Sequence, residues 1–101
     1  MKAITEGHFY ELDGFEDSFG DQELQFIHKE QRPGEGLVTI QDGTTNEEVL
    51  AVLIDRMHYL QSKFPCRENA IVITKLEESL MWLNKRTEDR KARGVEGKNE
   101  K

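Results

Sequence analysis

Two helices and the turn between them can be placed from residues 45–70, which read TNEEVLAVLIDRMHYLQSKFPCRENA. Thr45 and Glu48 have the spacing of a capping box, in which the hydroxyl accepts from an orphan amide and the carboxylate reaches back to the cap. Proline disfavours helical geometry in the residue before it. Pro65 is therefore expected to end a helix over about residues 46–64.

A second helix is predicted over about residues 67–93, because Gly94 stands at a typical stop position and basic residues fill the last turns. Helices joined by so short a connection form an antiparallel hairpin. The second helix would be about 40 Å long at 1.5 Å per residue. That length is too extended for a globular monomer of this size.

The apolar residues of the two helices exceed what a hairpin can bury. At 100° per residue those of the first helix span an arc of roughly 200°. They are Val49, Leu50, Val52, Leu53, Ile54, Met57, Leu60 and Phe64. The second helix has one stripe of Val72, Ile73, Leu76, Leu80 and Leu83, with Ile71 and Trp82 pointing elsewhere. One stripe can meet the partner helix and another a sheet, and the remaining surplus predicts self-association through helix faces.

Residues before Asp42-Gly43 show short apolar runs separated by turn residues. Aromatic and β-branched residues bounded by Gly, Pro and Asp are typical of strands. Three strands are expected, at residues 9–12, 24–28 and 37–41. The predicted fold class is therefore α+β, with a small N-terminal antiparallel sheet followed by a long antiparallel two-helix hairpin.

Length and composition limit the organisation to one domain. The chain has 101 residues, a net charge of -6 and a single cysteine, Cys66, which excludes an intramolecular disulfide and fits a reducing compartment. Its first residues show no signal peptide, and the longest apolar run, residues 49–54, is far short of the roughly 20 residues that span a bilayer. We expect a soluble cytoplasmic protein with no membrane partner. Its portions would be a sheet, a hairpin and a C-terminal tail, at residues 1–43, 44–94 and 95–101.

Signals for catalysis and metal binding are poor. The three histidines, His8, His28 and His58, form no pair at helical or zinc-ligand spacing, and no Gly-rich phosphate loop opens a helix. Glu47-Glu48 and Glu77-Glu78 resemble the carboxylate pairs of helical nucleotide hydrolases, although the first belongs to a helix start and the second to a solvent face. We expect no catalytic residue, no metal and no cofactor, with a hydrolase kept as a competing hypothesis.

Arg86, Arg90 and Arg93 share one face of the second helix. The plain interpretation is a solvated helix end whose bases favour the helix dipole. The functional interpretation is an anion site, since a guanidinium binds phosphate through two hydrogen bonds and stacks on aromatic rings. Five bases within residues 85–93 of an acidic protein are too few and too local to indicate binding of duplex nucleic acid.

A second group of polar and aromatic residues lies near the predicted turn. Tyr59 has an ordinary use as an interface aromatic, and Asn69 as a local cap for the second helix. A tyrosine ring near an amide and arginines also suits a purine and its phosphates.

Longer motifs resemble the helical hairpin shared by phage anti-Thoeris and anti-CBASS sponge proteins. They are Phe64-Pro65-Cys66-Arg67-Glu68-Asn69-Ala70, Ile73-Thr74-Lys75-Leu76-Glu77-Glu78, Trp82-Leu83-Asn84-Lys85-Arg86-Thr87 and Asp89-Arg90-Lys91-Ala92-Arg93-Gly94-Val95-Glu96-Gly97. The similarity covers roughly residues 44–97, and the sheet before residue 44 makes the chain look like the first type of anti-Thoeris protein.

This resemblance implies a non-enzymatic sponge that captures a cyclic ADP-ribose isomer made by bacterial TIR-domain proteins. Carried over by motif, Tyr59 would stack on the ligand, Asn69 would be a polar contact, and Arg86 and Arg90 would bind phosphate or stack on adenine. Arg67 matches the position of a cyclic trinucleotide contact.

Two features bear on which ligands the resemblance implies and on how many protomers form the site. Ile71, one turn after Arg67, stands where anti-CBASS relatives carry threonine, which counts against trinucleotide capture. The family also implies dimers that assemble into hexamers. Asn69 and Arg86 are seventeen residues apart on one helix, about 25 Å by helical rise, so one small ligand can reach all four residues only if two protomers pack head to tail.

An alternative from another class stays open. A small helical interaction or regulatory module would bind a host protein through its acidic sheet, and the surplus apolar surface would belong to that partner. Residues 1–64, which comprise that sheet and the first helix, hold 13 acidic and 5 basic side chains. His8 and His28 lie in the same portion, and the sequence does not assign them to a pocket.

Overall fold

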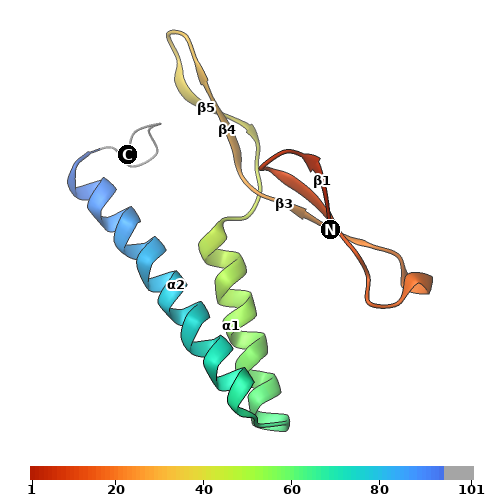
Figure 1. Ribbon diagram of the computed structural model, residues 1–101. Coiled ribbons are helices and arrows are strands. Elements are labelled where there is room, and N and C mark those ends of the chain that lie inside the picture. Colours follow the sequence, from red (N-terminus) through yellow and green to blue (C-terminus); the bar gives the residue numbers. More distant parts are fainter. Residues whose placement is uncertain (95–101) are drawn as a thin grey trace. The chain divides into compact units, whose positions relative to one another are not determined.

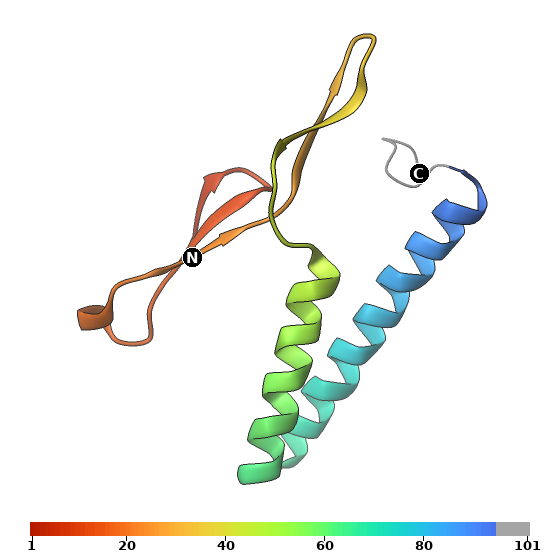
Figure 2. The ribbon, with the colours of Figure 1, turned by 180° about the vertical axis from the view of Figure 1, so that it is seen from behind.

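The computed structural model describes residues 1–94 and divides the chain into two compact units. The first comprises residues 1–45 and the second begins at Asn46. Figures 1 and 2 show strands in the first unit and a pair of helices in the second. The α+β class and the order of sheet before hairpin are confirmed. The predicted tail, residues 95–101, lies outside the described residues.

The first unit contains two small antiparallel sheets. One has three strands in the order β1-β2-β3, and the other has two, β4-β5. The bounds are β1 Lys2–Thr5, β2 Phe9–Leu12, β3 Gln22–Gln25, β4 His28–Arg32 and β5 Gly36–Gln41. A short 3-10 helix, Asp17–Phe19, lies in the connection between β2 and β3.

The strand predicted at residues 24–28 is wrong as a single element. The chain leaves the sheet after Phe26: the Phe26 amide still donates to the His8 carbonyl at 2.7 Å, whereas the Ile27 amide donates to the Thr44 carbonyl at 2.9 Å. β3 ends before these residues and β4 begins after them. β1 and most of β4 were not predicted, since their exposed, mostly polar residues lack a buried apolar face.

No side chain of the first unit is fully buried among the described residues. Ring contacts hold its segments together instead. The His8 and His28 rings stack with centroids 3.7 Å apart, and Tyr10 and Phe26 meet edge to face at 5.9 Å. A unit of this size with so little burial has a small margin of stability.

The second unit is a helical hairpin of α1, Asn46–Lys63, and α2, Arg67–Ala92. Both predicted ranges are confirmed to within one residue. Cys66 is the N-cap of α2, because its sulfur accepts from the Asn69 amide at 3.4 Å. Gly94 ends the helix with φ of 73°, a left-handed value that glycine adopts without steric cost.

A stripe at alternating spacings of three and four residues faces inward along α2. Its less exposed members are Asn69, Ile73, Leu76, Leu80, Leu83, Thr87 and Arg90, of which Ile73 and Arg90 are buried. This spacing places the side chains on one face of the helix, toward α1. Val72, assigned to this stripe from the sequence, is instead 41% exposed.

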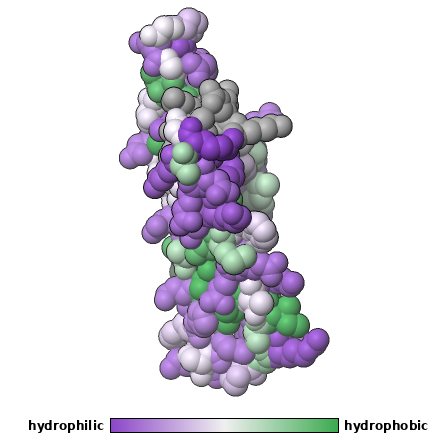
Figure 3. Space-filling view, turned by 90° about the vertical axis from the view of Figure 1, so that its left-hand side faces the viewer, coloured by the Kyte–Doolittle hydropathy of each residue, from purple (hydrophilic) through white to green (hydrophobic). Residues whose placement is uncertain are grey.

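The hairpin exposes the apolar surplus that the sequence predicted. Its exposed large apolar side chains are Val52, Leu53, Tyr59, Phe64, Ile71, Val72, Met81 and Trp82. Figure 3 shows hydrophobic residues at the surface toward the hairpin tip, between hydrophilic ones. Large apolar side chains exposed in this number on one small unit are typical of interaction faces. Within residues 1–94, neither helix is long and apolar enough to cross a membrane.

Candidate functional site

Hydrogen bonds of side chains fix the tip of the hairpin. The Gln61 side chain donates to the Cys66 carbonyl at 3.1 Å and accepts from the Cys66 amide at 3.0 Å. The Asn69 side chain donates to the Phe64 carbonyl at 3.5 Å. The use of Asn69 as a cap was wrongly predicted, because Cys66 caps α2 and the Asn69 side chain spans the turn instead. Its half-buried amide keeps further hydrogen-bonding capacity for a ligand.

Tyr59 lies on α1 near the same end of the hairpin, and its side chain is 59% exposed. The Lys63 ammonium lies 5.6 Å from the centre of its ring, in a cation–π contact. A planar ring so exposed offers a face on which a nucleobase can stack.

The two predicted arginines lie near the opposite end of α2 and differ in environment. Arg86 is exposed, whereas Arg90 is only 8% exposed and already has an interaction partner. They are one turn apart, so their guanidinium groups can approach a single anion. Nearby, Lys85 lies 3.4 Å from Asp89, which neutralises part of the helix end.

The hairpin therefore places the predicted residues near its two ends, two at each. Tyr59 and Asn69 lie at the tip, and Arg86 and Arg90 lie toward the far end of α2. Asn69 and Arg86 are about 25 Å apart along the helix axis. One chain does not place all four residues around one small ligand.

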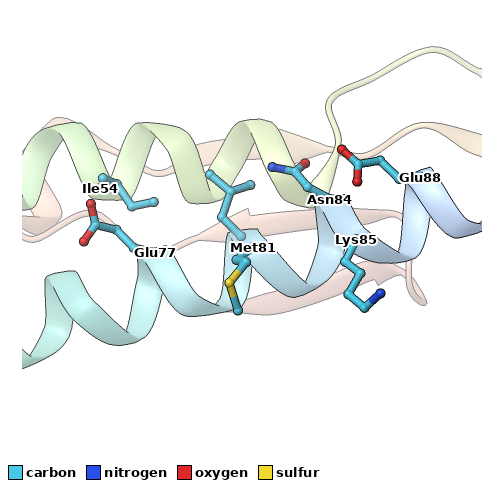
Figure 4. A pocket seen from close by; sticks show the side chains of 7 residues that line it. Ile54, Glu77, Met81, Asn84, Lys85 and Glu88 are labelled. Atoms are coloured by element: carbon cyan, nitrogen blue, oxygen red, sulfur yellow. The ribbon is translucent and has the colours of Figure 1, made fainter.

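A groove of about 680 Å³ lies on the hairpin, and none of the five predicted contact residues lines it. Its lining is Ile54, Glu77, Leu80, Met81, Asn84, Lys85 and Glu88. In Figure 4 the Glu77 and Asn84 side chains point toward α1, and those of Met81 and Lys85 point away from it. Two carboxylates and one ammonium make this groove a poor site for a dianionic ligand.

A smaller pocket of about 290 Å³ contains Arg67, the predicted oligonucleotide contact. Ala70, Ile71, Thr74 and Lys75 complete its lining. Sequence reasoning missed Lys75, although its spacing of eight residues from Arg67 places both on one side of a helix. The two cations can bind one anion together. The Thr74 hydroxyl already donates a hydrogen bond to the Ala70 carbonyl at 3.2 Å.

The carboxylates of the hairpin show no arrangement for metal chemistry. Among residues 1–94 no group of three or more His, Cys, Asp or Glu side chains could hold a metal ion. Glu77 is exposed, as expected for a solvent face, and its carboxylate lies 3.7 Å from the imidazole of His58 on α1. This contact gives Glu77 a structural use.

Comparison with known proteins identifies two similarities. Residues 23–88 match the family model described as Acb2/Tad1, hairpin domain. A protein named Thoeris anti-defense 1, from Bacillus phage SBSphiJ7, is 61% identical over 61 residues, which are 59% of this chain. The aligned part covers 43% of that relative's length.

Proposed function

The chain belongs to the Acb2/Tad1 hairpin family, and on that premise we propose that it is a phage anti-defence sponge acting in the host cytoplasm. It would bind a cyclic ADP-ribose-type signal made by TIR-domain proteins and withhold it without degrading it. One observation carries this proposal. An exposed ring, Tyr59, and an amide, Asn69, lie near one end of a family hairpin, and two arginines lie toward the other end. The name of the phage relative, Thoeris anti-defense 1, supports an anti-defence function.

The ligand pocket of this proposal needs two chains. With the hairpins packed head to tail, the Tyr59–Asn69 pair of one protomer would face the Arg86–Arg90 pair of its partner. A two-fold axis then makes two equivalent pockets per dimer. The exposed apolar residues of both helices supply surface for this packing, and dimers would assemble further into a hexamer.

The chemistry requires donors and a stacking surface, and no nucleophile. The pyrophosphate of the ligand carries two negative charges, which two guanidinium groups match through charge-assisted hydrogen bonds. Tyr59 would stack on the adenine, and Asn69 would donate to or accept from its polar edge. Because none of these groups would attack the ligand, we expect it to be released unaltered.

The pocket around Arg67 is proposed as a separate site for cyclic di- or trinucleotides. Arg67 and Lys75 provide two cations for the phosphates. Ile71 provides apolar contact there and lacks the hydroxyl of a threonine. A cyclic dinucleotide with two phosphates matches two cations better than a trinucleotide with three.

The test is depletion and recovery. The protein is incubated with the TIR-derived cyclic nucleotide, removed by filtration and heated, and both fractions are analysed by chromatography. A sponge depletes the nucleotide from the filtrate and returns it intact on heating. Recovery of linear products would indicate a hydrolase and contradict the proposal.

A protein-interaction module is the second candidate, because large apolar side chains such as Phe64 and Trp82 stay exposed on the hairpin. Such a module would bind a host protein and leave the nucleotide in the filtrate. The same experiment therefore separates the two functions.

A further inference from the structure

The connection between β2 and β3 presents two phenylalanines that nothing in the described chain covers. The side chain of Phe15 is fully exposed, and that of Phe19 is 84% exposed. They flank Glu16 and Asp17, which are also exposed. We call residues 13–21 the Phe loop. Two large aromatic side chains in water are unfavourable unless a partner removes them from it.

The Phe loop is held in one shape by its own ends. The Gly14 amide donates to Asp21 at 3.1 Å, and Asp13 pairs with the N-terminal ammonium at 3.0 Å. A side chain at Gly14 would come within 2.3 Å of the Gly20 carbonyl oxygen, so glycine is needed there. Asp13 and Asp21 thus serve the loop itself. Glu16 and Asp17 are the carboxylates of this loop that can face a partner.

A complementary surface exists on α2 of the same chain. Trp82 is 57% exposed, and Arg93 lies eleven residues later, on the same face by helical periodicity. We call this the Trp82–Arg93 face. It offers an aromatic plane and a cation where the Phe loop offers aromatic rings and carboxylates.

The Phe loop and the end of α2 that carries Arg93 have opposite charge. Residues 1–45 hold 10 acidic and 3 basic side chains, and residues 11–27 contain no base. Residues 85–93 hold five bases against two acids. Opposite charges steer association and fix register, and aromatic pairs add stacking contacts.

We propose that the Phe loop of one chain docks on the Trp82–Arg93 face of a second copy. Phe15 and Phe19 would contact the Trp82 indole, while Glu16 and Asp17 would pair with Arg93. Each copy carries both surfaces, so each can offer its loop to one copy and its helix face to another. The interaction uses neither Tyr59 nor Asn69, but Arg86 lies on the same face between Trp82 and Arg93, so docking of the loop and nucleotide binding at Arg86 would compete.

Disulfide trapping tests the contact directly. In a Cys66→Ser background, chains carrying Asp17→Cys and chains carrying Arg93→Cys are mixed at equal concentration and oxidised mildly. Serine keeps the capping function of residue 66. A disulfide needs Cα atoms roughly 4.4–6.8 Å apart, so trapping reports close approach. We expect a cross-linked heterodimer.

Lys91→Cys is the matched control, because Lys91 is exposed near the same end of α2 but lies on another side. It should cross-link at least ten-fold less. Equal yields from residues 91 and 93 would overturn the proposal. So would a chain with both Asp17→Cys and Arg93→Cys that closes on itself as a monomer.

Charge reversal provides a second measurement without cysteines. Glu16→Lys with Asp17→Lys, and separately Arg93→Glu, should each weaken self-association at least ten-fold in sedimentation. Mixing the two variants should restore association, because each loop then meets a face of opposite charge. Unchanged association of the single variants, or no recovery on mixing, would contradict docking between copies and leave the Phe loop to a different protein.

Discussion

Gln61 binds the backbone of Cys66 through both ends of its side-chain amide, at 3.1 Å and 3.0 Å. The last turns of α1 and the N-cap of α2 are thereby joined by one side chain. Cys66 in turn accepts from the Asn69 amide. The position of Asn69, a proposed ligand contact, thus depends on a residue eight positions earlier in the chain.

Replacing Gln61 should loosen this turn. Gln61→Ala removes two hydrogen bonds, and we expect a loss of about 1–2 kcal/mol in the free energy of unfolding, measured by urea denaturation. Gln61→Glu keeps the acceptor for the Cys66 amide and should lose less. Ser79→Ala is the control, since the Ser79 hydroxyl donates to the Lys75 carbonyl within α2 and lies away from the turn. If Ser79→Ala lowered the free energy of unfolding as much as Gln61→Ala, the hydrogen bonds of Gln61 to Cys66 would not be what stabilises the turn.

Gly43 should be intolerant of any side chain. A Cβ there would come within 2.4 Å of the Gln25 carbonyl oxygen, which also accepts from the Thr44 amide at 2.8 Å. Because backbone must move, Gly43→Ala should cost about 2 kcal/mol or more in the free energy of unfolding. Gly34→Asn is the control, since asparagine tolerates the left-handed φ of 77° and a Cβ meets nothing within 4 Å. Amide exchange at Thr44 would report the local loss.

The helices were predictable because their signals are local. A proline at the turn, a glycine after the last helical residue and apolar periodicity suffice to place α1 and α2. The hydrogen bonds of Gln61 were not predictable, because a glutamine near a helix end has many possible partners. Only the folded turn puts its amide beside Cys66.

The strands were harder because β1 and β4 pair through backbone groups while their side chains stay exposed. No alternation of apolar and polar residues marks such a strand. The ligand residues were chosen by resemblance, and the burial of Arg90 beside the exposed Arg86 emerged only from the structure. The sulfur cap of α2 was also missed, since cysteine is not a usual capping residue.

The ring of Tyr59 should matter to ligand binding more than its hydroxyl. Stacking of a base on an aromatic ring contributes about 1–3 kcal/mol, so Tyr59→Ala should weaken binding of the cyclic ADP-ribose isomer roughly ten-fold or more. Tyr59→Phe keeps the ring and should stay within about three-fold of the parent protein by calorimetry. Lys63→Met removes the cation near the ring and serves as a control for its charge. Equal affinities for the alanine and phenylalanine variants would exclude stacking.

The two arginines should respond differently to substitution. Arg86 is exposed, so Arg86→Ala should weaken ligand binding by at least about 1–2 kcal/mol, ten-fold or more, without loss of stability. Arg86→Lys should also bind less tightly, because lysine lacks the planar fork of donors. Arg90→Ala should weaken binding similarly and also lower the free energy of unfolding, since Arg90 is buried. Lys91→Ala, which removes an exposed cation near the same helix end, should change neither quantity. Calorimetry that finds unchanged affinity in both arginine variants would refute their assignment to the pocket.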